Sequence, residues 1–105
     1  MKSGQVKVNE KVESIVLKIQ SIVADQVEGD YKLFLFGSRA NGKSMERSDI
    51  DIAIMTNEKM DASILAKIRE EIENISTLLT IDFVDLSTVD DDFRNHVLET
   101  GSRLD

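Results

Sequence analysis

Residues 37–51 read GSRANGKSMERSDID, a glycine-serine pair followed, after ten residues, by two aspartates at alternate positions. The preceding residues 32–36 read KLFLF, which is typical of a short buried strand that ends in a tight turn. Gly37 allows the backbone to approach a ligand closely, and Ser38 begins a short helical turn whose free N–H groups face an anion. This stretch therefore predicts a phosphate-binding turn.

The two aspartates begin a second predicted strand, residues 49–55. The two-residue period of a strand places Asp49 and Asp51 on one face and the intervening isoleucines on the other. Their α-carbons are then ~6.5–7 Å apart, so the two carboxylates can converge on one or two divalent ions. Oxygen ligands suit Mg²⁺ or Mn²⁺ rather than zinc, since the chain has no cysteine and one distant histidine.

Together, the Gly-Ser pair, the ten-residue spacing and the Asp-x-Asp strand resemble the signature of the polymerase-beta-like nucleotidyltransferase superfamily. The small size and residues 37–42, GSRANG, are similar to the minimal nucleotidyltransferases, typified by the antitoxins encoded beside HEPN-domain toxins. The resemblance covers nearly the whole chain and implies a third carboxylate on a later strand. Residues 81–86, IDFVDL, offer Asp82 and Asp85. Asp82 matches the first aspartate of the family's third strand, whereas a turn cap is a sufficient explanation for Asp85 near the strand end.

The reaction implied by the resemblance is nucleotidyl transfer, in which an acceptor hydroxyl attacks the α-phosphorus of a nucleoside triphosphate and pyrophosphate leaves. Two Mg²⁺ ions would neutralise the triphosphate and stabilise charge on the attacking and leaving oxygens. The implied catalytic and metal-binding residues are Asp49, Asp51 and Asp82. The implied phosphate-binding residues are Gly37, Ser38 and, by proximity alone, Arg39.

The acceptor is not encoded in the motif, and a chain of 105 residues has little room for a separate acceptor-binding lobe. By resemblance, the first hypothesis is an antitoxin that forms a hetero-oligomer with a HEPN ribonuclease toxin and transfers AMP from ATP to a toxin tyrosine. The second is a non-catalytic antitoxin that neutralises the toxin by occlusion. The third is a nucleotidyltransferase subunit for a small molecule or another protein. No base-recognition motif selects ATP over other triphosphates.

Charge and composition indicate which partners and which cellular compartment to expect. The formal net charge of −7 argues against a protein whose main task is to bind a nucleic-acid backbone and favours a basic partner. The lack of cysteine fits a reducing cytoplasm. We see no signal peptide or membrane-length apolar segment. We therefore expect a cytoplasmic protein without membrane association or direct nucleic-acid binding.

The remaining pattern predicts a single α/β (α+β) domain over residues 1–105, a small mixed sheet of about three strands flanked by helices. The resemblance implies that this is the nucleotidyltransferase fold. Residues 1–8 are polar and are expected to be loosely ordered. An amphipathic helix is expected from Asn9, as its N-cap, to the turn at Gly29. A second helix is expected after Asp61, with its charged face solvated.

The last predicted helix begins near Phe93, after an acidic turn that caps it. We expect it to pack through Phe93, Val97 and Leu98 and to stop at Gly101. His96 has no cysteine or histidine companion, so we interpret it as a half-buried helix residue rather than a ligand.

Overall fold

The computed structural model describes the backbone of residues 3–37 and 49–104, and side chains within these ranges from residue 12 onward. The elements, in chain order, are α1 (Ser3–Gln26), β1 (Tyr31–Phe36), β2 (Ile50–Thr56), α2 (Ala62–Glu73), β3 (Ile81–Asp85), the short 3-10 helix η1 (Leu86–Thr88), α3 (Asp91–Thr100) and β4 (Ser102–Leu104).

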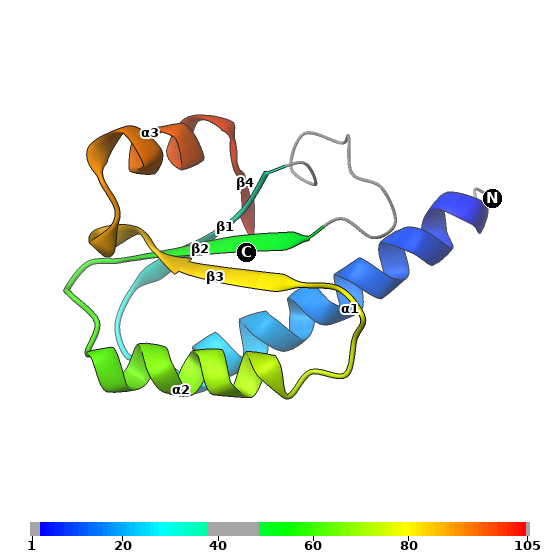
Figure 1. The fold of residues 1–105 in the computed structure, drawn as a ribbon, viewed down its shortest axis with the longest axis horizontal. Coiled ribbons are helices and arrows are strands. Elements are labelled where there is room, and N and C mark those ends of the chain that lie inside the picture. The colour runs from blue at the N-terminus through cyan, green and yellow to red at the C-terminus, as the bar shows by residue number, and fades with distance from the viewer. Residues whose placement is uncertain (1–2, 38–48, 105) are drawn as a thin grey trace.

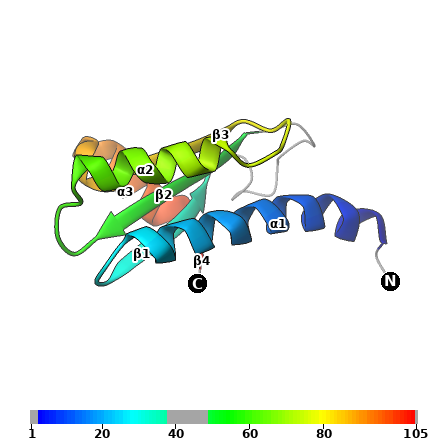
Figure 2. The ribbon, with the colours of Figure 1, turned by 90° about the horizontal axis from the view of Figure 1, so that it is seen from below.

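The strands form one mixed sheet in the order β3-β2-β1-β4. β1 is antiparallel to both β2 and β4, and β2 is parallel to β3. A parallel pair needs a crossover connection, which α2 provides. α1 and α2 lie on one face of the sheet and α3 on the other (Figures 1 and 2). The predicted fold class is confirmed, with four strands in the described chain rather than about three.

The two faces of the sheet have separate apolar cores. The three β2 isoleucines Ile50, Ile52 and Ile54 are fully buried on the α1 and α2 face. Because side chains alternate along a strand, these isoleucines face α1 and α2, whereas Asp51 and Ala53 face the other side of the sheet. On the α3 face, the smaller core consists of Phe34, Phe36, Ala53, Leu86 and Val97.

The first helix is longer than the sequence indicates. It begins at Ser3 rather than at the expected N-cap, Asn9. Residues 5–8 contain neither proline nor glycine, and nothing there prevents the helix from extending past the expected cap. The helix ends at Gln26, and Gly29, with a φ of +86°, makes the turn into β1. Of the described helices, none has the length and apolarity needed to cross a membrane.

Charged residues of α2 do more than face solvent. The guanidinium of Arg69 donates hydrogen bonds of 2.9 Å and 3.3 Å to the carbonyl of Phe83 in β3. The carboxylate of Glu71 accepts a 2.8 Å hydrogen bond from the side chain of Gln26 in α1. Arg69 is exposed, as a solvated face predicts, and Glu71 is half-buried; both also tie α2 to its neighbours.

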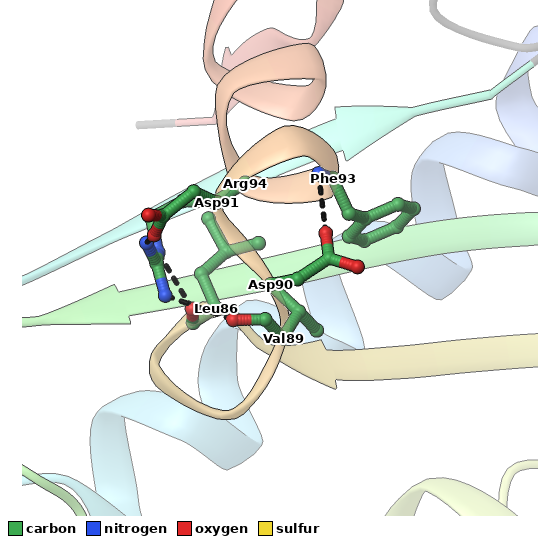
Figure 3. Close-up of polar contacts among 6 residues, drawn as sticks. All are labelled: Leu86, Val89, Asp90, Asp91, Phe93 and Arg94. Atoms are coloured by element: carbon green, nitrogen blue, oxygen red, sulfur yellow. Dashed lines mark hydrogen bonds and ion pairs between the residues drawn. The ribbon is translucent and has the colours of Figure 1, made fainter.

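A set of polar contacts around Arg94, here called the Arg94 clasp, holds the first turn of α3 to η1 and to the residue after it (Figure 3). Asp90 accepts a 2.8 Å hydrogen bond from the backbone N–H of Phe93, which caps the helix as the acidic turn predicts. Arg94 donates 2.9 Å hydrogen bonds to the carbonyls of Leu86 and Val89 and forms an ion pair with Asp91. The start of α3 is thereby fixed relative to η1, which directly follows β3.

The middle of α3 departs from the prediction. Val97 is fully buried as expected, and Phe93 packs against Phe36 although 36% of it is exposed, whereas Leu98 is 38% exposed. His96 is exposed rather than half-buried. Only one helix face reaches the small core of the α3 side, because a helix of ten residues presents few positions to it.

Candidate active site

Asp49, Asp51 and Asp82 lie at one end of the sheet. In the parallel pair of β2 and β3, Asp51 is the register partner of Asp82. Asp49 directly precedes β2 and is exposed. The crossover through α2 thus brings together carboxylates that are distant in the sequence.

Asp51 and Asp82 are on the α3 face of the sheet. Residues two positions further along each strand, Ala53 and Val84, belong to the core on that face. Alternation places Asp51 with Ala53, and Asp82 with Val84. The face that Asp51 shares with Asp82 is therefore opposite to the face of the sheet that packs against α1 and α2.

Gly37 is in direct contact with Asp51. Its φ is +78°, a left-handed conformation that side chains disfavour. A Cβ atom added to Gly37 would lie 2.5 Å from Oδ2 of Asp51. Only glycine at this turn therefore leaves the Asp51 carboxylate where it is, which gives Gly37 a role beyond the predicted approach to a phosphate.

The surroundings of Asp51 disfavour its negative charge. Burial raises the pKa of Asp51 above its ordinary value, and the neighbouring charges of Asp82 and then Asp49 raise it further. A divalent cation would relieve this repulsion, and carboxylate oxygens are the ligands that Mg²⁺ prefers. The three residues therefore fit such an ion chemically. Within residues 3–37 and 49–104, however, no three acidic, His or Cys side chains form a ready-made metal site.

The raised pKa of Asp51 predicts a stability change with pH. A carboxyl whose folded pKa lies above its unfolded value binds protons more tightly when folded, so stability decreases as the pH rises from about 3.8 through the folded pKa. Asp51→Asn should therefore raise the melting temperature at pH 7, and the difference should shrink as the pH approaches 4. Calorimetric melting curves across this range test this. A variant that melts below the wild type at pH 7 would contradict it.

Asp85, the alternative third carboxylate, is engaged elsewhere. Its side chain is only 2% exposed, and its Oδ1 accepts hydrogen bonds of 3.0 Å from the Ser87 N–H and 2.9 Å from the Ser87 hydroxyl. Asp85 is the N-cap of η1. This geometry matches the predicted turn cap and leaves Asp82 as the β3 carboxylate beside Asp51.

Two of the predicted phosphate-binding residues, Ser38 and Arg39, lie outside the described residues. The sequence reasoning did not single out Phe36, which is opposite Asp51 in the pairing of β1 with β2. The position of Phe36 directly before Gly37 was the available signal. The sequence reasoning also missed the structural roles of Arg69 and Arg94, because their hydrogen bonds to backbone carbonyls have no local sequence signature.

Comparison with known proteins identifies the family of the chain. The family described as Polymerase beta, Nucleotidyltransferase matches residues 17–104. A curated relative, the probable protein adenylyltransferase MntA of Haemophilus influenzae, is 31% identical over 83 residues, which cover 79% of this chain and 73% of the relative.

Two solved structures share the fold. One contains the tri-AMPylated Shewanella oneidensis HEPN toxin with its MNT antitoxin, with a TM-score of 0.65 and 21% identity, covering 87% of this chain and 69% of the matched chain. The other is a toxin-antitoxin structure with AMP-PNP, with a TM-score of 0.61 and 23% identity, covering 87% and 70%. The chain therefore belongs to the polymerase-beta-type nucleotidyltransferases, as a minimal nucleotidyltransferase.

Proposed function

We propose that this chain is a Mg²⁺-dependent protein adenylyltransferase that acts as an antitoxin, transferring AMP from ATP to a tyrosine of a cognate HEPN ribonuclease toxin. The observation that carries the proposal is the register of Asp51 with Asp82, with Gly37 packed against the Asp51 carboxylate. The name of the 31% identical relative, a probable protein adenylyltransferase, supports the reaction. Toxin-antitoxin structures of the same fold, one with AMP-PNP and one with an AMPylated HEPN toxin, support ATP and the partner.

In this proposal each site residue has a defined task. Asp49, Asp51 and Asp82 hold Mg²⁺, which when bound neutralises triphosphate charge. Asp82 also accepts the proton of the attacking hydroxyl. Gly37 keeps the Asp51 carboxylate in place, and its own backbone is assigned a contact with the terminal phosphates. The further phosphate contacts are assigned to Ser38 and Arg39.

The partner supplies the acceptor. Residues 1–105 act as one domain in this proposal, and the toxin surface completes the acceptor side of the site in a hetero-oligomer. The net charge of −7 suits a basic ribonuclease. A cytoplasmic setting is part of the same proposal, because it is where such a target would be found.

Intact mass spectrometry tests the proposal. A cognate HEPN toxin is incubated with this chain, ATP and Mg²⁺, separated under denaturing conditions and weighed. We expect a mass increase of one or more AMP groups, and a toxin that stays inactive after the antitoxin is removed, because a covalent bond outlasts the complex. Chelation of Mg²⁺ should abolish the increase.

Other outcomes identify the alternatives. An unshifted mass with full neutralisation, also by the double variant Asp49→Asn/Asp51→Asn, would replace the enzyme with an antitoxin that acts by occlusion. Transfer of AMP to another protein or to a small molecule, without any effect on a HEPN protein, would keep the enzyme class and change the acceptor.

A further inference from the structure

Phe93 is an exposed aromatic residue beside the candidate active site. It lies in the first turn of α3, and 36% of its surface is accessible. Its ring contacts that of Phe36 edge-to-face, with centroids 5.7 Å apart and planes at 85°. The ring is thus supported on one side by the core of the α3 face and open on another.

Phe36 connects this ring to Asp51. The two residues are register partners in β1 and β2, so their side chains are neighbours on the same face, with Cβ atoms ~4.5–5.5 Å apart. Phe93 is therefore one aromatic side chain further from the carboxylates than Phe36. In a nucleotide the base likewise lies one ribose away from the phosphates, so Phe93 is an exposed ring on the side of Phe36 to which the base of a nucleotide at Asp51 could extend.

The backbone under Phe93 is firmly held. Its N–H is bonded to the Asp90 carboxylate, and the next residue, Arg94, is bonded to the carbonyls of Leu86 and Val89. In Figure 3 the ring of Phe93 projects from the helix on the side away from the Arg94 clasp. An aromatic ring fixed in advance loses little conformational freedom on binding, which is the property that a stacking platform requires.

We infer that Phe93 is a stacking platform for the base of the nucleotide that the Asp51 site binds. This inference rests on the proposed function, because it assigns a further part of the same site. Every base has a π-face, so stacking on Phe93 adds affinity without choosing among bases. This agrees with the lack of a base-recognition motif in the sequence.

Calorimetric titration distinguishes the contribution of the base to binding from the contribution of the phosphates. Mg²⁺-ATP, Mg²⁺-GTP and Mg²⁺-tripolyphosphate are each titrated into the wild type, into Phe93→Ala and into Leu98→Ala, which removes an equally exposed apolar residue of the same helix. We expect Phe93→Ala to bind ATP and GTP about 5- to 150-fold more weakly, the loss that corresponds to one stacked base. Tripolyphosphate binding should stay unchanged, and Leu98→Ala should behave as the wild type.

A fluorescent variant gives a second measurement. The chain contains no tryptophan, so Phe93→Trp introduces a single reporter. We expect ATP to change its emission, tripolyphosphate to leave it unchanged, and the affinity for ATP to match or exceed that of the wild type.

Several results would overturn the inference. If Phe93→Ala weakens tripolyphosphate as much as ATP, the residue only supports Phe36 and the fold around Asp51. If it binds ATP normally but no longer binds the toxin, the exposed ring belongs to the partner interface. If the wild type binds neither ATP nor tripolyphosphate with Mg²⁺, the proposed function itself fails and the base site with it.

Discussion

Asp51→Asn should reduce AMP transfer by roughly 100- to 1,000-fold or more, because it removes a charge that the reaction requires around the triphosphate. Asparagine keeps the size of the side chain. The raised pKa of Asp51 means that its negative charge destabilises the folded protein in the absence of a cation. The variant should therefore fold at least as well as the wild type while losing activity. The initial rate of toxin AMPylation, followed by mass at saturating ATP and Mg²⁺, measures the loss.

The neighbouring strand offers matched variants. Asp82→Asn should lose transfer to a similar degree, since Asp82 is the register partner of Asp51. Asp85→Asn should retain the rate per folded molecule and lose ~1 kcal/mol of stability, because the buried carboxylate accepts two hydrogen bonds from Ser87. An inactive Asp85→Asn together with an active Asp82→Asn would exchange the two assignments.

Gly37→Ala should have the second largest effect. The new Cβ would lie 2.5 Å from Oδ2 of Asp51, so the carboxylate must move. Rotation of an aspartate side chain costs little stability, but it displaces the group on which the proposed reaction depends. We expect transfer to decrease by roughly tenfold or more, as for other misplaced groups in active sites. Rates at saturating ATP, and the affinity for Mg²⁺-ATP, should both decrease.

Gly29→Ala provides the control for this experiment. Gly29 has a similar positive φ of +86°, but a Cβ there would meet nothing within 4 Å. Both alanine variants should therefore lose the ~1–2 kcal/mol expected for a left-handed alanine, and only Gly37→Ala should lose activity in excess. Equal activity losses in the two variants would show that backbone strain, rather than contact with Asp51, explains the effect.

Much of the fold could be predicted because its signals are local. The alternation of Asp51 with buried isoleucines predicts β2 and its two faces, and the acidic turn before Phe93 predicts the cap at Asp90. β4 was missed because three residues directly after Gly101 are too few to show a strand period. The pairing of β4 with β1 is a tertiary contact without a local pattern.

The sequence predicts which residue types form the candidate site, but not which of them are in contact. Spacing predicted that Asp49 and Asp51 share a face, but it left Asp82 and Asp85 to be separated by resemblance and position. Only the structure shows Asp85 buried against Ser87 and Asp82 opposite Asp51. The contact of Gly37 with Asp51 joins the ends of two strands, and no sequence pattern reports it.

Arg69 also protects the sheet from unwanted association. β3 is an edge strand, and an open edge is a template onto which a second chain can add its own strand and begin to aggregate. The guanidinium of Arg69 occupies the carbonyl of Phe83, and its charge deters an incoming strand. At the opposite edge, β4 spans three residues and offers a short template. At least one backbone carbonyl of the strand that carries Asp82 is therefore unavailable to an incoming strand.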